Sequence, residues 1–319
     1  DLEYPRENLF SPGVSRLTIG PISNNCRKQG KVMRICRYND NRIGVVRGDN
    51  VHDVSAIIDL LPTSRYPYPA SGDALIANLE SLRPRMEELA DAATPVPVSS
   101  VKLLSPVANP TKIIGTPANY KAHAAEAQAD KQISGGRPSR TIEEQGLFLK
   151  ANSALVGAGE GVALRFPDRR TDHEAELGVI IGKKASNISY EDAFSCVAGY
   201  AIALDMVVRG PEDRSFRKSV DTYAVLGPWL VTSDEIADPE VLSFSLTIDG
   251  EVRQTSNTAE MIMDLRRQIS WGSQFYTLNP GDIIMSGTCE GVSQVKAGDV
   301  MHLEFESIGS MDVAIRDDV

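Results

Sequence analysis

The sequence predicts an α+β fold in which strands dominate and pair mostly antiparallel. Short apolar runs separated by turn residues recur through residues 106–319, which is typical of strands. An Asp-Gly dipeptide at 249–250 joins two such runs, 245–248 and 251–254, and it favours a tight hairpin. Apolar residues at helical spacing are confined to a few segments, so we expect helices to be the minor component.

Residues 1–105 are expected to form an N-terminal arm and a small β-meander domain with one helix. The arm covers about 1–30, which are polar and irregular. Strands are predicted at 32–38 and 42–46, because the apolar residues there are joined by an Asn-Asp-Asn turn whose residues tolerate positive φ. The meander is expected to continue toward 54–58.

A helix is predicted after the meander. Ser71 is its expected N-cap, and apolar residues recur at helical spacing from Leu75 to Leu89. We expect Pro84 to interrupt this helix, because proline lacks the amide hydrogen that the helical ladder needs. A proline-punctuated segment at 94–97 follows, and the domain boundary is placed shortly after it.

The predicted catalytic domain, 106–319, consists mainly of strands. A helix is expected to open at a capping box of Asn257 and Glu260. Its apolar face would carry Met261, Ile262, Leu265 and Ile269. The predicted strands lie at 112–115, 147–150, 162–164, 174–182, 198–204, 226–231, 283–285, 300–305 and 311–315.

Two glutamates at the start of the 174–182 strand are candidate metal ligands. Glu174 and Glu176 share one face of the strand because side chains alternate, while the apolar residues between and after them can bury the other face. Their carboxylates could converge on a hard cation such as Mg²⁺, Mn²⁺ or Ca²⁺. The alternative is that both glutamates simply face water.

Further polar residues follow the next apolar strand. Asp205 ends the strand at 198–204 and is a candidate third ligand, or else an aspartate that starts a turn. Arg209 and Lys218 lie in the charged segment after it. They could hold an anionic substrate beside a metal, or they could only solvate the loop.

An alanine-rich segment after Tyr120 predicts a short helix. His123 and Glu126 are three residues apart, so they lie on one helical face, where the carboxylate can orient the imidazole as a general base. The alternative is a solvated helix face. Glycines at 135–136 follow, and we expect the segment near 120–146 to be a lid over the site.

Composition excludes several classes of protein. The net charge of −10 argues against nucleic-acid binding, because no basic stripe is present to contact phosphates. No apolar run approaches the roughly 18 residues that a membrane span needs. The four cysteines lack the spacing of a zinc site or disulfide framework, so a cytoplasmic location is expected.

Several motifs occur in an order that resembles the fumarylacetoacetate hydrolase family. The match covers about residues 112–319, and the meander near 31–60 resembles the family's common small N-terminal domain. The motifs are His123-x-x-Glu126 after Asn119-Tyr120, Glu174-x-Glu176-Leu177, Asp205, Lys218 before Val220-Asp221-Thr222, Leu226-Gly227-Pro228-Trp229, and Pro280-Gly281-Asp282 before Ser286-Gly287-Thr288.

This resemblance implies a mixed β-sheet roll, usually a homodimer, with a metal-dependent active site. By it, Glu174, Glu176 and Asp205 bind Mg²⁺ or Mn²⁺, with Ca²⁺ a further candidate in crystals. His123 and Glu126 form a dyad on the lid, with Lys218 as a further catalytic residue. The residues expected to contact substrate are Tyr120, Arg209, Lys218 and Thr288.

The resemblance implies chemistry on a small dicarbonyl acid. The leading expectation is hydrolysis of the C–C bond of an acylpyruvate-like 2,4-dioxo acid, as in the catabolism of aromatic compounds. The alternatives are decarboxylation of an oxaloacetate-like acid, isomerisation of a 2-hydroxy-dienoate, and ligand binding without turnover. The retained dyad argues against the last, because a binding protein needs no general base.

The chain departs from the family pattern at three places. Asn119 stands nearest to an additional aspartate ligand of the name-giving enzyme, so we expect three carboxylate ligands. Cys289 follows the Gly-Thr pair where many relatives have proline, and Glu212 replaces a glutamine. The last two changes concern the part of the site that would accept the substrate's tail.

Overall fold

The computed structural model describes residues 33–63, 66, 72–136, 138 and 140–317. Contacts between Cα atoms divide the chain into two units, 1–31 and 32–319, and the residues described here belong to the second. The predicted arm at 1–30 and the predicted cap Ser71 lie outside the described residues.

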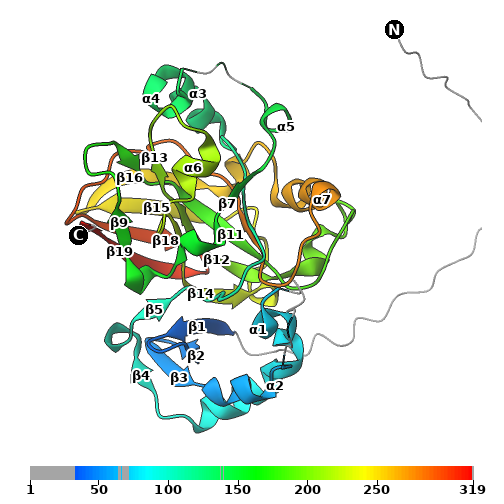
Figure 1. Cartoon of the computed structure of the whole chain (residues 1–319). Helices are drawn as coiled ribbons and strands as arrows, with labels where there is room; N and C mark the ends of the chain where they lie inside the picture. Colours follow the sequence, from blue (N-terminus) through cyan, green and yellow to red (C-terminus); the bar gives the residue numbers. More distant parts are fainter. Residues whose placement is uncertain (1–32, 64–65, 67–71, 137, 139, 318–319) are drawn as a thin grey trace, which may run out of the picture. The chain divides into compact units, whose positions relative to one another are not determined.

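A large mixed sheet organises the second unit (Figure 1). Its path runs β4-β3-β2-β1-β14-β12-β11-β17-β6-β7, with β5 and β8 paired at the side of this path. The strands are β1 (Arg34–Tyr38), β2 (Arg42–Arg47), β3 (Asn50–Asp53), β4 (Val96–Pro97), β5 (Leu103–Leu104), β6 (Ile113–Gly115), β7 (Phe148–Lys150), β8 (Leu155–Val156), β11 (Ala175–Ile181), β12 (Val197–Asp205), β14 (Ala224–Thr232) and β17 (Ile283–Met285).

A second sheet of five strands packs against the first. Its order is β16-β15-β18-β19-β9. Asp249 and Gly250 both have positive φ, at 52° and 80°, so the predicted hairpin between β15 and β16 is confirmed. The strands are β9 (Val162–Leu164), β15 (Ser243–Ile248), β16 (Glu251–Asn257), β18 (Val300–Phe305) and β19 (Gly309–Asp317), and a separate pair is formed by β10 (Thr171–Asp172) and β13 (Val207–Val208).

The core lies on both faces of the large sheet. Leu177 of β11 belongs to an apolar cluster shared with the five-stranded sheet, whereas Ile180 of the same strand belongs to a cluster shared with helix α2 (Leu79–Ala92). Strand β11 is therefore buried on both sides, and its polar residues have to be satisfied within the protein. The strand-dominated α+β class that the sequence predicts is confirmed.

The N-terminal meander departs from the prediction in its third strand. That strand is β3, and residues Ser55–Leu60 form a 3₁₀ turn (η1), so the strand expected at 54–58 is wrong. Val54 and Ile57 are both buried and lie three residues apart, which fits a helical turn. Because β1 pairs with β14, residues on both sides of the expected boundary share one sheet. The boundary at residue 105 stays a prediction.

The first predicted helix forms two pieces, α1 (Ala74–Ala77) and α2. Asp73 caps α1 by accepting bonds from the amides of the second and third residues after it. The break falls at Asn78, and α2 continues through Pro84, so the expected interruption there is wrong. Pro84 is exposed and the carbonyl that it leaves without a partner belongs to exposed Glu80, so water can satisfy this group.

The helix expected to open at Asn257 begins later. Asn257 instead caps a 3₁₀ turn, η7 (Thr258–Glu260), and helix α7 (Leu265–Phe275) is capped by Asp264. The Ile262 amide donates to the Asn119 carbonyl, so this stretch pairs as extended chain before α7 can begin. Of the predicted apolar face, Leu265 and Ile269 therefore lie in α7, whereas Met261 and Ile262 lie in the segment that precedes it.

Short helices cover the end of the sheet opposite β1–β4 (Figure 1). The predicted alanine-rich helix is confirmed as α3. A capping box of Thr141 and Glu144, which the sequence prediction did not include, opens α5. Among the described residues, no helix combines the length and apolar character of a membrane span. The helices at this end are α3 (Lys121–Ala129), α4 (Lys131–Ser134), α5 (Ile142–Gln145) and α6 (Arg214–Lys218).

Candidate metal centre and active site

Three buried carboxylates converge where β11 and β12 meet. Glu174 directly precedes β11, Glu176 lies within it, and Asp205 ends β12. The antiparallel register places the last residues of β12 opposite the first of β11, and the Asp205 amide donates to the Glu174 carbonyl at 2.9 Å. One oxygen from each carboxylate lies within 4.8 Å of the others. Oxygen ligands so arranged suit a hard divalent cation.

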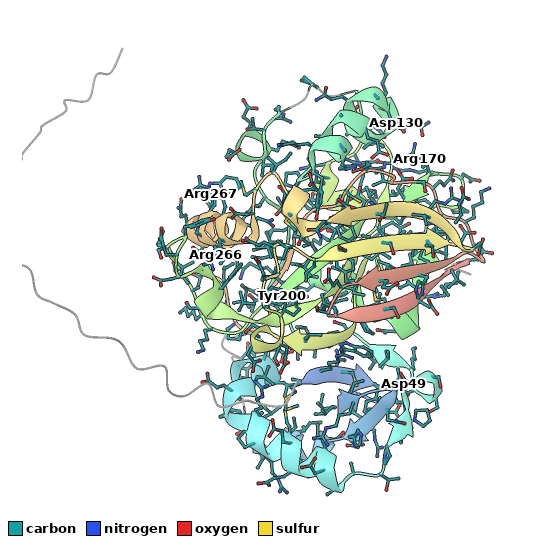
Figure 2. All side chains as sticks on the ribbon, turned by 180° about the vertical axis from the view of Figure 1, so that it is seen from behind. Asp49, Asp130, Arg170, Tyr200, Arg266 and Arg267 are labelled. Atoms are coloured by element: carbon teal, nitrogen blue, oxygen red, sulfur yellow. The ribbon has the colours of Figure 1, made fainter. Side chains whose placement is uncertain are left out.

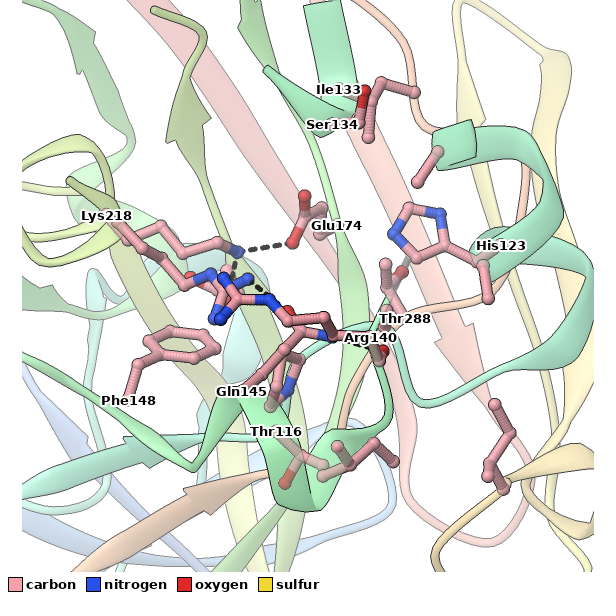
Figure 3. A pocket seen from close by; sticks show the side chains of 18 of the residues that line it. Thr116, His123, Ile133, Ser134, Arg140, Gln145, Phe148, Glu174, Lys218 and Thr288 are labelled. Atoms are coloured by element: carbon pink, nitrogen blue, oxygen red, sulfur yellow. Dashed lines mark hydrogen bonds and ion pairs between the residues drawn. The ribbon is translucent and has the colours of Figure 1, made fainter. Parts of the chain in front are cut away.

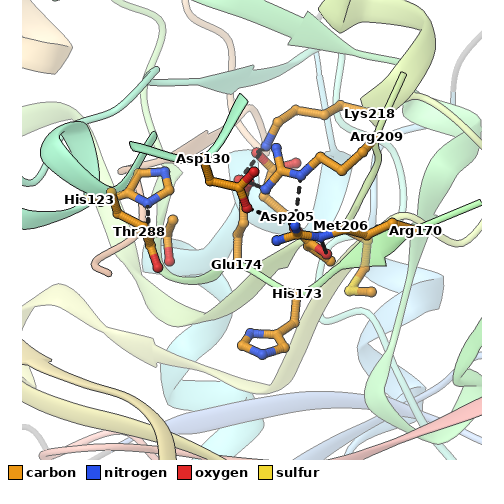
Figure 4. Close-up of polar contacts among 12 residues, drawn as sticks. His123, Asp130, Arg170, His173, Glu174, Asp205, Met206, Arg209, Lys218 and Thr288 are labelled. Carbon is orange, nitrogen blue, oxygen red and sulfur yellow. Dashed lines mark hydrogen bonds and ion pairs between the residues drawn. The ribbon is translucent and has the colours of Figure 1, made fainter. Parts of the chain in front are cut away.

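Cationic side chains surround this cluster (Figure 4). The Lys218 ammonium donates to Glu174 at 2.5 Å and also to Asp205. Arg209 donates to Glu174 at 3.1 Å. Lys150, at the end of β7, is fully buried and bonds to Asp205. The sequence prediction did not include Lys150. The only sequence feature that points to it is a basic residue at the end of an apolar strand, and this feature alone is weak.

The carboxylates differ in their electrostatic environments. Burial alone would raise the pKa of Glu174, but the charges of Lys218 and Arg209 outweigh it and lower the pKa to about 2. Burial and the neighbouring charge of Asp205 raise the pKa of Glu176 well above its usual range, although the Gly287 amide donates to this carboxyl group at 2.8 Å. A divalent cation bound between the three carboxylates would oppose this repulsion and favour the ionised form of Glu176.

The predicted dyad forms on helix α3. The His123 ring bonds through Nδ1 to Glu126 at 2.9 Å, and the other Glu126 oxygen accepts the Gly291 amide at 3.0 Å. With a proton on Nδ1, the Nε2 lone pair is free to act as a base. Gly291 has φ of +91°, and a Cβ there would lie 1.9 Å from the Arg253 carbonyl oxygen, so this turn requires glycine.

A cavity of about 430 Å³ brings His123 of the dyad and the carboxylates together (Figure 3). His123 and Ile133 of the predicted lid, 120–146, line it on one side and the carboxylate cluster lines it on the other. Phe148 and Ile142 add apolar surface. The cationic side chains among the described lining residues are Arg140, Arg209, Arg214, Arg217 and Lys218.

Two of the expected substrate contacts have different surroundings. Thr288 lines the cavity, but its hydroxyl donates to the Ala175 carbonyl and accepts from the Gln254 amide, both at 2.8 Å. Tyr120 is 2% exposed and lies outside the residues that line the cavity; its ring packs edge-on against Phe244. Thr288 thus also links the glutamate-bearing strand to the second sheet.

The three residues that depart from the family pattern, Asn119, Glu212 and Cys289, have different surroundings in the structure. The Asn119 side chain donates to the carbonyls of Met263 and Ser286 and accepts the Met263 amide, so its polar atoms are all used in joining loops. Glu212 forms a two-bond ion pair with Arg169 outside the cavity lining. Cys289 is fully buried, and burial raises the pKa of its thiol to about 12.

The family model described as fumarylacetoacetate (FAA) hydrolase C-terminal matches residues 112–316, which is more than half of the chain. The chain belongs to the fumarylacetoacetate hydrolase family. The resemblance in the ordered motifs is therefore confirmed, and the fold is that of this family.

Relatives within the family carry several activities. A maleylpyruvate hydrolase from Aquipseudomonas alcaligenes is 54% identical over 286 residues, covering 89% of this chain and 99% of that protein. A mitochondrial oxaloacetate tautomerase from Xenopus laevis is 32% identical over 311 residues, covering 91% and 92%. The structure of maleylpyruvate hydrolase from Sphingobium sp. SYK-6, in complex with manganese(II) ion and pyruvate, has a TM-score of 0.76 and 37% identity, covering 90% of this chain and 100% of that one.

Proposed function

We propose that this protein is a metal-dependent hydrolase that cleaves a C–C bond of an acylpyruvate, with maleylpyruvate as the leading candidate. The observation that carries the proposal is one cavity with a buried three-carboxylate centre on one side and, on the other, His123, whose ring bonds to Glu126. The 54% identity to a maleylpyruvate hydrolase supports it over nearly the whole length of that relative.

The donor set fits a hard divalent cation, and Mn²⁺ or Mg²⁺ is the proposed cofactor. Glu174, Glu176 and Asp205 would hold it, since all three are buried and their oxygens converge. When bound, the ion supplies a Lewis acid for the 2-oxo acid end of the substrate. Lys218 and Arg209 keep Glu174 charged, and Gly287 orients Glu176.

His123 acts as the general base in the proposed reaction. Its Nε2 takes a proton from water, Glu126 stabilises the resulting imidazolium, and the hydroxide adds to the distal carbonyl carbon. The bond between that carbon and C3 then breaks, its electron pair stays on C3, and C3 takes back a proton. The products are a carboxylic acid and pyruvate. In this proposal Lys218 stabilises the negative charge that develops on oxygen.

The cationic lining of the cavity supports a substrate whose tail carries a second carboxylate. Arg214 donates to Gln145 at 2.8 Å, and its guanidinium lies 5.2 Å from the centre of the Phe148 ring. These three residues and Arg140 line the same cavity as the carboxylate centre. A guanidinium can bind a carboxylate with two parallel hydrogen bonds, which suits a dicarboxylate such as maleylpyruvate.

A homodimeric assembly and a cytoplasmic location complete the proposal. The described cysteines Cys36, Cys196 and Cys289 are all free thiols, in keeping with a reducing compartment. Light scattering of the purified protein would measure the assembly state, and cell fractionation the location.

The deciding experiment is a substrate panel measured with Mn²⁺, with Mg²⁺ and with a chelator. We expect release of pyruvate from maleylpyruvate and other acylpyruvates, abolished by the chelator and restored by either ion. Turnover of oxaloacetate alone would favour the alternative functions, an oxaloacetate decarboxylase or tautomerase, for which the Xenopus relative is the supporting observation. Activity that survives complete removal of metal would contradict the proposed centre.

A further inference from the structure

An ion-pair chain leads from the metal centre to the helices above the cavity. Asp172, two residues before Glu174, is completely buried, yet the proposed reaction gives it no role. One of its oxygens accepts from Arg209 at 2.8 Å and the other from Arg170 at 2.7 Å. Burying the Asp172 carboxylate destabilises the fold unless both arginines remain bonded to it. Movement of either arginine therefore affects the other through Asp172.

The inner end of the chain reaches the metal centre through Arg209. This guanidinium bonds to Asp172 through Nε and to Glu174 through Nη2. The short sheet of β10 and β13 sets this geometry, since Asp172 pairs with Val207 and the Arg209 amide donates to the Arg170 carbonyl. Arg209 therefore divides its positive charge between a proposed metal ligand and a second carboxylate.

The outer end of the chain reaches the helices through Arg170. Its Nη1 donates to Asp130 at 2.8 Å (Figures 2 and 4) and to Gln132 at 3.1 Å. Asp130 ends α3 and caps α4, because its amide donates to Glu126 and its other oxygen accepts the Gln132 amide. The contact thus fixes the junction between the helix that carries His123 and the helix that lines the cavity.

We propose that Arg170 and Asp172 are positioning residues that couple the packing of the α3–α4 junction over the cavity to cation binding at Glu174. This coupling rests on the proposed metal centre. Charges alternate along the chain Asp130, Arg170, Asp172, Arg209 and Glu174.

The sign of the coupling follows from the way these charges are shared. A cation on Glu174 weakens the attraction between Glu174 and Arg209, so Arg209 binds Asp172 more strongly. Asp172 then attracts Arg170 less, and Arg170 binds Asp130 more strongly. The stronger bond to Asp130 stabilises the α3–α4 junction in its observed position. Linkage makes the effect reciprocal, so fixing the junction must raise the cation affinity by the same factor.

The test measures amide hydrogen exchange of residues 121–136 in the full chain, with and without Mn²⁺ as the probe. We expect Mn²⁺ to slow exchange there by about five-fold or more in the wild type, the usual lower range of such couplings. Arg170→Gln should still bind Mn²⁺, because the three carboxylates are untouched, but it should lose the protection and bind Mn²⁺ more weakly by the same factor.

Asp130→Asn is the second variant, and it keeps α4 capped because asparagine is as good an N-cap as aspartate. It should lose most of the protection for the same reason as Arg170→Gln. The matched control is Arg47→Gln, which removes an ion pair of 2.6 Å between β2 and Asp91 of α2 and should behave like the wild type.

Two outcomes separate this inference from the proposed function. Normal Mn²⁺ binding with equal protection in the wild type, Arg170→Gln and Asp130→Asn would overturn the coupling and leave the metal centre intact. Absence of Mn²⁺ binding to the wild-type protein would overturn both.

Discussion

At the scale of single residues, the environment of His123 defines what its substitution does. The imidazole is 6% exposed, bonds to Glu126 and belongs to no part of the carboxylate cluster. We expect His123→Ala to lower kcat for acylpyruvate hydrolysis by about 10²–10⁴-fold, the usual contribution of a general base, with unchanged Mn²⁺ affinity by calorimetry. The control is His302→Ala, which removes a half-buried histidine of β18 outside the cavity lining and should retain full activity. Equal activity in both variants would exclude the dyad from the chemistry.

Arg214 offers a residue-scale test of the substrate's tail. Removing a charge-assisted hydrogen bond costs about 1.5–3 kcal/mol, so Arg214→Gln should raise KM about 10- to 150-fold for an acylpyruvate with a carboxylate tail. The same variant assayed with an acylpyruvate that has an uncharged tail is its own control and should change little. An equal rise in KM for both substrates would place the tail elsewhere in the cavity.

At the scale of elements, one aspartate joins the starts of the paired strands β6 and β17. Asp282, fully buried before β17, accepts the amides of Thr111, Lys112 and Asn279 and also bonds to the Lys112 ammonium. We expect Asp282→Ala to lower the free energy of unfolding by about 3–5 kcal/mol, because it leaves three backbone amides without their acceptor and removes the buried half of an ion pair with Lys112. Urea unfolding followed by circular dichroism would measure this.

The control for that variant lies in a second turn of the same Gly-Asp type. Asp299 accepts the Lys296 amide at 2.8 Å in a more exposed position. Asp299→Ala should cost only about 0.5–1.5 kcal/mol, the net value of an ordinary hydrogen bond. Similar losses for the two variants would contradict the structural role given to the buried network.

Elements were predictable from the sequence where local signals and tertiary pairing agree. The Asp-Gly hairpin and the strand carrying Glu176 were correct because turn preference and alternation act locally. The helix expected at Asn257 was wrong because the next residues pair with Asn119, a contact distant in sequence. The interruption expected at Pro84 was wrong for a related reason. Whether the carbonyl that loses its amide donor faces water depends on which side of the helix packs against the sheet, and the sequence alone does not give this.

At the scale of the whole molecule, the candidate site was predictable only in part. The clustering of Glu174, Glu176 and Asp205 was predictable because a two-residue spacing and a strand end both leave signals in the sequence. The contacts of Lys150 and Arg170 were not predictable, because they depend on the order of strands and on which helix lies above them. Contacts between segments that are distant in the sequence depend on how the strands pair and on how the helices pack, and the periodicity of the sequence does not specify either.

The buried thiols predict how the stability of the whole molecule depends on pH. Burial raises the pKa of Cys36 to about 12, of Cys196 to about 11 and of Cys289 to about 12, against 9.0 for an ordinary thiol. Between pH 9 and 11 the unfolded chain therefore releases protons that the folded chain keeps. The free energy of unfolding should fall as pH rises through this window, by up to about 1.4 kcal/mol per pH unit for each thiol.

Urea unfolding at pH 8, 9 and 10 would measure this slope, with Cys36→Ala expected to have a shallower one. In the folded protein these three thiols should also fail to react with a thiol-specific reagent at pH 8, while denaturant should expose them. A fast reaction of all three without denaturant would contradict their burial. Cys26 lies outside the described residues.

The hydrogen bond from Gly291 to Glu126 has a consequence for how the family can diversify. Its donor is main chain, so exchange of neighbouring side chains in the turn leaves this support of Glu126, and through it of His123, in place. At position 291 itself any side chain would collide with the Arg253 carbonyl. Substitution of the neighbouring side chains can therefore alter the charge and size of this turn, whereas substitution of this one glycine should displace the amide that Glu126 accepts.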